Sequence, residues 1–308
     1  MNYASLTLRD LEYLVAVADL SGVSAAAAQC RVAQPSLSAQ VKKIETNLEV
    51  VIFERGKGRM TLTPKGAPVV AQARVVLAEA RRLFEVARTG GDPLSGTLRL
   101  GVIATLAPYL IPHLIDPVQT RFPCLKLIFN EALTAELIAA LVAGELDAAL
   151  LSTPLSENRL RAEPLFFEPF FAICHAQSQL SEKTGLSLAD LEEEGMILMD
   201  EGHCLRGQAL EACRVRAGGR QERHAASVET LRHLVAAGSG HSLIPALAVK
   251  YDPRLDRTVR YFPLVDQNVG RTIALTWRAS DPRSCGYQVL SGFLASISLP
   301  GVVRLAVS

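Results

Sequence analysis

The chain has 308 residues, enough for two or three domains with separate hydrophobic cores. Hydrophobic residues make up 49% of it, charged residues 20%, and the net charge is +1, so the composition is that of an ordinary soluble globular protein and shows no overall preference for nucleic acid. No secretory signal and no run of about 18 uncharged apolar residues is present, which excludes a spanning helix and predicts a cytoplasmic protein without membrane contact.

Residues 1–66 predict short helices with tight connections. Apolar residues recur at helical spacing over 8–17, and a second short helix begins at Ser24, whose hydroxyl we expect to cap it. After a turn of about four residues a third helix begins at Pro35, because proline suits the first turn of a helix. Two short helices joined by such a turn are typical of a helix-turn-helix.

A hairpin is predicted after the third helix. Two glycines lie between short β-prone segments over 53–63, which is typical of a wing. Seven basic and three acidic residues lie within 31–65, so the third helix and the wing carry a local net charge of +4. Their basic side chains suit DNA phosphates, and the short polar ones suit base edges. The candidate DNA-binding residues are Gln34, Pro35, Ser36, Ser38, Gln40, Lys42, Arg55, Lys57 and Arg59.

Residues 67–92 predict a long linker helix that pairs with a second copy of itself. Val69, Val76 and Leu83 lie seven residues apart, and alanines fill the alternate positions. Sustained spacing of this kind favours a dimerisation helix. The sequence Gly-Gly-Asp-Pro over 90–93 then marks a domain boundary.

Beyond this boundary the pattern changes to alternating strands and helices. The alternation over 97–151 argues for a mainly parallel sheet, and the last strand and helix, at about 271–297, return to the first subdomain. The chain is therefore α+β overall. The predicted division is a winged helix-turn-helix over 1–66, a linker helix over 67–92 and a two-lobed α/β regulatory domain over 93–308, with lobe I at about 93–165 and 271–308 and lobe II at about 166–270.

Two of the six cysteines, Cys204 and Cys213, lie in one short helical segment. Gly202 can start a turn that places Cys204 in the first turn of a helix, where the helix dipole favours a thiolate. His203 and Arg206 could add positive charge or a proton, whereas the two acidic residues before the glycine oppose this. The cysteines show no CxxC pair and no zinc-binding spacing, so we expect no metal and no other cofactor.

The spacing of this pair predicts that a bond between the two thiols would act as a switch. If 204–213 is helical, nine steps of about 1.5 Å place the two Cα atoms roughly 13 to 14 Å apart. A disulfide needs a Cα–Cα distance of about 4.4 to 6.8 Å, so the bond requires the helix to melt. The alternative interpretation, which the spacing leaves open, is that both thiols are partly buried packing residues.

The DNA-binding segment resembles that of LysR-type transcription regulators. The resemblance rests on Ala-Ala-Ala-Gln-Cys-Arg-Val-Ala-Gln-Pro-Ser-Leu-Ser-Ala-Gln over 26–40, Phe-Glu-Arg over 53–55 and Thr-Leu-Thr-Pro-Lys-Gly over 61–66. It extends over essentially the whole chain. It implies a homodimer or homotetramer on double-stranded promoter DNA, and a signal site between the lobes of a periplasmic-binding-protein-like effector domain.

Residues 202–213 resemble the peroxide-sensing, OxyR-like branch of this family, through Gly-His-Cys-Leu-Arg, then Gln-Ala and a second cysteine. The segments 229–232, 236–240 and 245–249 fit the same branch. The resemblance implies that hydrogen peroxide is the signal, that Cys204 is oxidised to a sulfenic acid, and that Cys213 resolves it into a disulfide. The implied peroxide pocket consists of Thr105, Thr134, His203 and Arg271.

The same resemblance implies a regulator that is not an enzyme, with RNA polymerase and a cellular dithiol reductant as further partners. Gly207 departs from the branch, because an acidic residue often follows the Leu-Arg pair there. Glycine lowers helix propensity by about 1 kcal/mol relative to alanine, which favours unwinding of the segment.

Two other functions remain open at this level. One is a LysR-type regulator that binds a small metabolite between its lobes, with Cys204 in a structural role. The other is a thiol peroxidase or a stand-alone solute-binding protein, against which the predicted winged helix argues.

Overall fold

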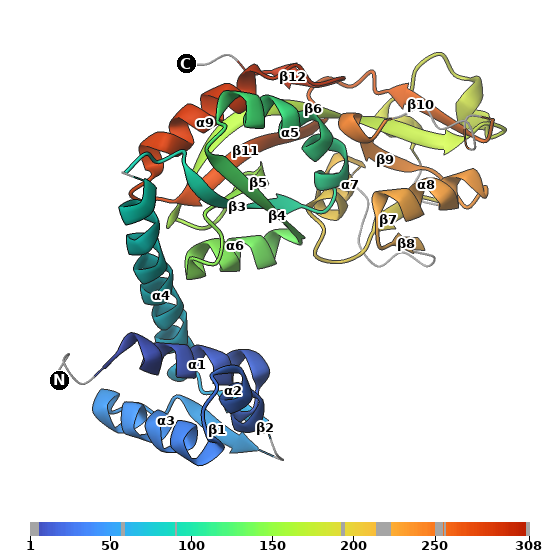
Figure 1. Ribbon diagram of the computed structural model, residues 1–308. Helices are drawn as coiled ribbons and strands as arrows, with labels where there is room; N and C mark the ends of the chain where they lie inside the picture. The colour runs from blue at the N-terminus through green and yellow to red at the C-terminus, as the bar shows by residue number, and fades with distance from the viewer. Residues whose placement is uncertain are drawn as a thin grey trace. The chain divides into compact units, whose positions relative to one another are not determined.

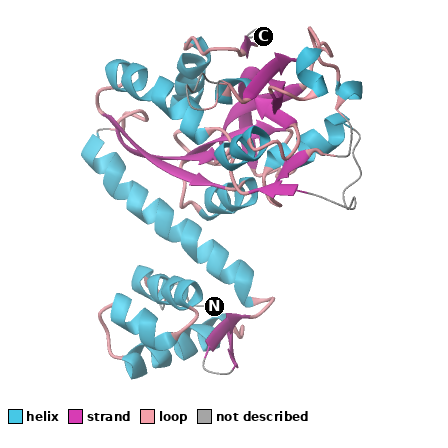
Figure 2. Cartoon of the chain, turned by 90° about the vertical axis from the view of Figure 1, so that its right-hand side faces the viewer, coloured by secondary structure: helices cyan, strands magenta, loops and turns pink. Residues whose placement is uncertain are grey.

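The computed structural model describes residues 6–56, 59–89, 91–191, 195–213, 223–249, 255 and 257–305. The chain divides into two compact units, Met1–Asp92 with Val142–Glu145, and Pro93–Leu141 with Leu146–Ser308. Figure 1 labels the elements of both units in chain order, and Figure 2 distinguishes their helices from their strands. Among the described residues, no helix combines the length and the apolar character needed to cross a bilayer.

The first unit begins with three helices, α1 (Leu8–Leu20), α2 (Val23–Gln29) and α3 (Gln34–Leu48). Thr7 and Asp10 form a capping box at the start of α1, which satisfies amide groups that the helix leaves unpaired. The apolar faces of the three helices meet in one core, as their periodicity predicts. The short turn between α2 and α3 confirms the predicted helix-turn-helix.

The predicted cap at Ser24 is wrong. α2 begins one residue earlier, at Val23, with Gly22 at its N-cap and no side-chain cap. Ser24 therefore lies inside the first turn of the helix, and its hydroxyl donates to Oε1 of Gln34 at 2.9 Å. The hydroxyl links α2 to the start of α3 instead of capping α2.

The predicted wing is present as β1 (Phe53–Gly56) and β2 (Arg59–Leu62), an antiparallel pair. Oε1 of Glu45 on α3 accepts hydrogen bonds from the backbone amides of Ile52 and Phe53, which fixes the wing to that helix. α4 (Gly66–Thr89) follows. A Cβ at Gly66 would lie 2.1 Å from the carbonyl oxygen of Ile52, so only glycine permits this approach of α4 to the wing.

The second unit begins as an α/β fold in which β3 lies between β5 and β4 and pairs with both in parallel. Right-handed crossovers in this order place α5 and α6 on opposite faces of the sheet, as Figure 1 shows. The bounds are β3 (Gly96–Ile103), α5 (Ala107–Arg121), β4 (Leu125–Ala132), α6 (Thr134–Ala143) and β5 (Ala148–Thr153).

One long strand, β6 (Leu160–His175), runs through both lobes of this unit. Its first part pairs with β11 (Gly270–Arg278), and its last part pairs with β9 (Ser242–Pro245) and β10 (Val259–Pro263). All of these pairs are antiparallel, so the prediction of a mainly parallel sheet holds only for β3 with its two neighbours. The difference arises because β11 returns from lobe II and enters lobe I antiparallel to β5.

The remaining elements complete the two lobes. Lobe II holds a parallel pair of strands, β7 and β8, with two helices, and α9 packs on lobe I, where the Phe122 and Phe293 rings meet edge to face. The bounds are β7 (Ile197–Met199), α7 (Cys204–Cys213), β8 (Arg223–Ala225), α8 (Val228–Ala236), α9 (Ser284–Ser296) and β12 (Val303–Arg304), with short 3-10 helices at Gln179–Glu182, Leu188–Asp190 and Ala246–Ala248.

Candidate functional site

α7 begins at Cys204 because the chain turns sharply just before it. Gly202 has a φ of 90°, which favours glycine, and a Cβ there would lie 2.9 Å from Cδ1 of Leu133. Leu133 precedes Thr134, so this contact places the start of α7 beside the start of α6. Cys204 is the first residue of α7, which confirms the predicted position at the positive end of the helix dipole.

Arg271 on β11 brings positive charge to Cys204. Its Nη1 lies 3.9 Å from Sγ of Cys204 and donates to Oγ1 of Thr105 at 2.7 Å. Its Nη2 donates to the backbone oxygen of Thr105 at 3.2 Å. Three of the residues predicted from the sequence are therefore in direct contact.

A buried carboxylate, Glu168 on β6, balances the charge of Arg271. Nε of Arg271 lies 2.8 Å from Oε2 of Glu168, and both side chains are fully buried. Burial by itself lowers the pKa of the guanidinium, but the charge of Glu168 and then that of the Cys204 sulfur outweigh it, so the pKa of Arg271 is raised. The guanidinium stays charged, and a cation at this distance favours a thiolate.

Thr134 lies at the same edge of the sheet as Thr105. β3 and β4 are parallel neighbours in which Ile103 pairs with Ala132, and each threonine follows its strand by two residues. Oγ1 of Thr134 is buried and has no hydrogen-bond partner among the described residues. A buried hydroxyl without a partner costs free energy, so it is a candidate contact for a small polar ligand.

The predicted pocket omitted Gln208, which lies one helical turn after Cys204 and so on the same face of α7. Its Nε2 donates to Oγ of Ser152, at the end of β5, at 2.7 Å. Its Oε1 is buried without a partner in the part of the chain that the structure describes. The four-residue spacing in the sequence could have indicated Gln208, whereas the contact with Ser152 depends on the tertiary fold.

His203 and Arg206, predicted as nearby sources of charge or a proton, differ in placement. His203 lies in the turn before α7, half-buried, and its backbone carbonyl accepts from the amide of Arg206 at 3.1 Å. Nη1 of Arg206 donates to the backbone oxygen of Met199 and lies 2.8 Å from Nδ1 of His224. The cation in contact with Cys204 is thus Arg271, from a distant strand.

Cys213 ends α7 in a different environment. Burial, and to a smaller extent the charge of Asp266, raises the pKa of its thiol to about 11. Because 204–213 is helical, the two cysteine Cα atoms lie about 13.5 Å apart at about 1.5 Å per residue. Both thiols are free cysteines, as the helical spacing predicts.

The candidate DNA-binding residues lie mainly on the exposed surface of α3 and the wing. Gln34, Pro35 and Ser36 are exposed in the first turn of α3, and Lys42 and Arg59 are exposed further along. Ser38 is half-buried. Lys57 and the side chain of Arg55 lie outside the described residues, so their contact with DNA stays a prediction.

Gln40 has a structural contact that the sequence did not indicate. Its Nε2 donates to Oδ1 of Asp10 on α1 at 2.6 Å. The same carboxylate group caps α1 through Thr7, and these bonds lower the pKa of Asp10 although burial opposes them. Gln40 therefore ties α3 to α1, and its role in DNA binding stays a prediction.

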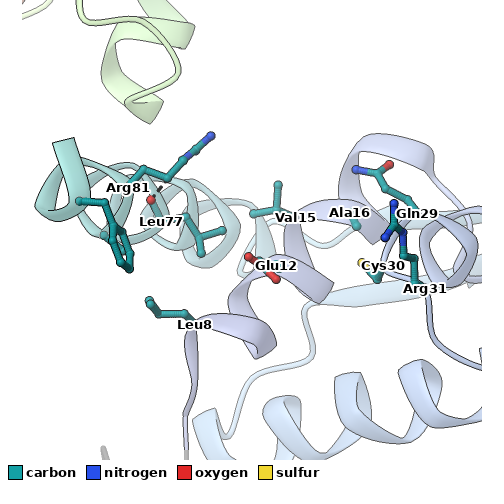
Figure 3. Close-up of a pocket in the computed structure, with 11 residues that line it drawn as sticks. Leu8, Glu12, Val15, Ala16, Gln29, Cys30, Arg31, Leu77 and Arg81 are labelled. Atoms are coloured by element: carbon teal, nitrogen blue, oxygen red, sulfur yellow. Dashed lines mark hydrogen bonds between the residues drawn. The ribbon is translucent and has the colours of Figure 1, made fainter. Parts of the chain in front are cut away.

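A hollow of about 510 Å³ with a mixed polar and apolar lining lies between α1, α4 and the turn after α2 (Figure 3). Leu8 on α1 and Leu77 on α4 line it, together with Phe84, whose side chain is 69% exposed. Leu83 beside it is 70% exposed. The first part of the predicted α4 stripe is buried against the other helices, as Val70 shows, while its later part faces outward.

No group of three or more His, Cys, Asp and Glu side chains gathers into a metal site in the described ranges of the chain.

Two family models match the chain. Residues 8–67 match the bacterial regulatory helix-turn-helix protein of the lysR family, and residues 91–296 match the LysR substrate binding domain. The DNA-binding transcriptional dual regulator OxyR of Escherichia coli strain K12 is 39% identical over 93% of this chain and 94% of its own. A hydrogen peroxide-inducible genes activator of Haemophilus influenzae is 35% identical over 92% of this chain and 94% of its own.

Solved structures agree in fold. A full-length OxyR of Pseudomonas aeruginosa, solved as a variant with aspartate in place of one cysteine, has a TM-score of 0.74 and 37% identity, and the match covers 96% of this chain and 99% of that one. A hydrogen peroxide-bound cysteine-to-serine mutant of Corynebacterium glutamicum OxyR has a TM-score of 0.62 and 29% identity, over 94% and 93% of the two chains. The chain therefore belongs to the LysR family of DNA-binding transcription regulators, and within it to the OxyR-like branch.

Proposed function

We propose that the protein is a peroxide-responsive transcription regulator in which Cys204 is the sensing thiol. The observation that carries the proposal is the 3.9 Å approach of Nη1 of the buried Arg271 to Sγ of Cys204, at the positive end of α7. Relatives named as hydrogen peroxide-inducible activators, and a neighbour solved with hydrogen peroxide bound, support the same signal. The hydroxyls of Thr105 and Thr134 supply polar groups at the same edge of the sheet.

The first step is oxidation of Cys204. Its thiolate attacks one oxygen of hydrogen peroxide, the O–O bond breaks, and the second oxygen leaves as hydroxide, which takes up a proton to become water. The sulfur is oxidised to a sulfenic acid and the peroxide is reduced. Arg271 stabilises the thiolate, and the unpartnered hydroxyl of Thr134 can donate to the peroxide. His203, half-buried and adjacent to Cys204 in the sequence, is a group that can carry a proton.

The second step joins the two cysteines. Cys213 attacks the sulfenic sulfur, the S–S bond forms and the hydroxyl leaves as water. Because the Cα atoms begin about 13.5 Å apart, α7 must unfold for this bond to form. Leu205 and Ala209 are the buried residues of α7, and Leu210, Ala212 and Cys213 pack partly against the core, so unfolding of the helix must break these contacts. A cellular dithiol then reduces the disulfide and is itself oxidised.

The change in transcription arises because this refolding is coupled to DNA binding. α3 and the wing bind double-stranded promoter DNA, and the exposed apolar side chains of α4 pair with a second copy to form a homodimer or homotetramer. The disulfide favours one of two arrangements of the regulatory domain, which changes how the copies sit on DNA and how they contact RNA polymerase.

The test compares wild type with Cys204→Ser in footprints and transcription from the protein's own promoter region, before and after peroxide. We expect peroxide to change both for wild type and neither for the variant. Cys124→Ser is the matched control, because Cys124 is an exposed cysteine outside this site, and it should respond as wild type does. A response that survives in Cys204→Ser would contradict the proposal and favour regulation by a metabolite.

A further inference from the structure

The ion pair between Glu168 and Arg271 is built into the sheet. The two residues are direct partners across the antiparallel strands β6 and β11, and both side chains are fully buried. Oε2 of Glu168 accepts from Nε of Arg271 at 2.8 Å, and Oε1 accepts from the backbone amide of Leu247 at 3.0 Å. Both carboxylate oxygens are therefore occupied by donors from different segments, which leaves the carboxylate little freedom.

This arrangement fixes how Arg271 meets Cys204. The guanidinium is planar, so a bond at Nε on one side determines where Nη1 and Nη2 lie on the other. Thr105 takes a bond from each of these nitrogens, and Nη1 also reaches Sγ of Cys204. Any effect of Glu168 on the thiol therefore passes through Arg271 or through the charge of the carboxylate.

We propose that Glu168 is a positioning residue for the thiol chemistry, which holds Arg271 against Cys204 and, by sharing its charge, sets the pH range in which Cys204 becomes a thiolate. The inference rests on the proposed function. A carboxylate beside the cation reduces the positive potential at the sulfur, so it weakens the stabilisation that Arg271 gives to a thiolate there. The carboxylate thus limits the reactivity of Cys204 while keeping its partner in place.

Other charged groups near this thiol come from several elements. Arg206 on α7 donates to Met199 and lies against His224. Further titratable groups lie in the turn before α7, at Asp200, Glu201 and His203. Glu168 differs from these groups because it bonds the cation that contacts the sulfur.

The test measures the pH dependence of Cys204 alkylation in the reduced full-length protein, with iodoacetamide as the probe and peptide mass spectrometry as the readout. Glu168→Gln removes the charge and keeps the shape, so we expect the midpoint of alkylation to fall by about one pH unit. Asp281→Asn is the matched control, because it removes the carboxylate of another buried ion pair, with Arg278 at 3.0 Å. The control should leave the midpoint unchanged.

Glu168→Asp keeps the charge but shortens the side chain, so it loses one of its two donors. Because Arg271 is then held less firmly against Cys204, we expect a midpoint of alkylation that does not fall and several-fold slower oxidation of Cys204 by peroxide, and this variant decides the matter if Glu168→Gln does not fold. An unchanged midpoint in folded Glu168→Gln, the same shift in Asp281→Asn, or a wild-type oxidation rate in Glu168→Asp would overturn the inference. If peroxide fails to oxidise wild-type Cys204, the proposed function fails, but the alkylation profiles still test Glu168.

Discussion

Cys204 and Cys213 begin and end the same ten-residue helix, yet their thiols lie in opposite kinds of environment. Cys204 is at the positive end of the helix dipole, with the guanidinium of Arg271 3.9 Å from its sulfur. Cys213 is packed among apolar residues, and its burial raises the pKa of the thiol to about 11. One sulfur lies beside a buried cation, whereas the burial of the other keeps its thiol protonated.

In the proposed mechanism, this difference gives the refolding of α7 two effects at once. A thiolate is the nucleophile in sulfur chemistry, so Cys213 is a poor one while it stays in its buried position. Unfolding of α7 brings Cys213 towards Cys204, and it also releases Cys213 from the burial that raises its pKa. In this proposal, Cys213 is a poor nucleophile in the reduced state and becomes reactive as the helix opens.

The largest expected effect comes from removing the second thiol. In Cys213→Ser, peroxide should convert Cys204 to a sulfenic acid that persists, with no disulfide, because serine cannot attack the sulfenic sulfur. A mass gain of one oxygen atom, and labelling by a sulfenic acid reagent, would measure it. Promoter output should no longer switch to the oxidised state.

Cys285→Ser is a suitable control for this variant, because Cys285 is an exposed cysteine elsewhere in the chain. It should form the 204–213 disulfide at the wild-type rate. An intramolecular disulfide that still forms in Cys213→Ser would show that another cysteine reacts with oxidised Cys204. The proposal that Cys213 is the resolving thiol would then be wrong.

The Cys204 end of α7 could be predicted well from local sequence. Gly202 indicates the turn, the turn indicates where the helix begins, and this places Cys204 at the helix start. Local patterns cannot place Glu168, because it meets Arg271 through the register of β6 and β11, across 103 residues of chain. The family resemblance predicted Arg271 as a pocket residue, but no pattern in the sequence indicated its buried partner, Glu168.

Local sequence patterns also predict only part of the fold. Periodicity predicted α1, α3 and the parallel strands, since each depends on neighbours a few residues apart. The antiparallel return of β11 depends on the chain crossing between lobes, and the bond from Gln40 to Asp10 depends on how α3 packs on α1. Such contacts between distant segments are fixed by tertiary packing and leave no periodic pattern.

The second expected effect is a separation of the two thiols by pH. In reduced protein, Cys213 should react with iodoacetamide only as the pH approaches its pKa of about 11, whereas Cys204, whose sulfur lies beside the guanidinium of Arg271, should be modified more readily at lower pH. Asp266→Asn should lower the midpoint for Cys213, because the charge of Asp266 contributes to the raised pKa. If both thiols react over the same pH range, their environments are not different in solution.

The same pKa has a consequence for stability. The pKa of Cys213 in the folded state lies above the ordinary value of 9.0, so the folded state binds this proton more tightly than the unfolded state. The resulting contribution to stability is complete below a pH of 9.0 and is lost as the pH rises towards about 11. Chemical denaturation at a series of pH values should show this loss in wild type and not in Cys213→Ser.

The smallest expected effect concerns the helix between the two thiols. A Cβ at Gly207 would meet no atom within 4 Å, and the residue is exposed, so neither packing nor space requires glycine there. Alanine stabilises a helix by about 1 kcal/mol relative to glycine, which is about a fivefold change in an equilibrium constant. If oxidation unfolds α7 and reduction restores it, as proposed, Gly207→Ala should shift the disulfide equilibrium about fivefold towards the reduced form.

Gly292→Ala separates this effect from general stabilisation. Gly292 also lies inside a helix, α9, and a Cβ there would likewise meet no atom within 4 Å. Both variants should resist denaturation slightly better than wild type, but only Gly207→Ala should change the equilibrium with a dithiol buffer, because α9 does not take part in the proposed refolding. An equal shift in both variants, or none in Gly207→Ala, would contradict the proposal that α7 unfolds when the disulfide forms.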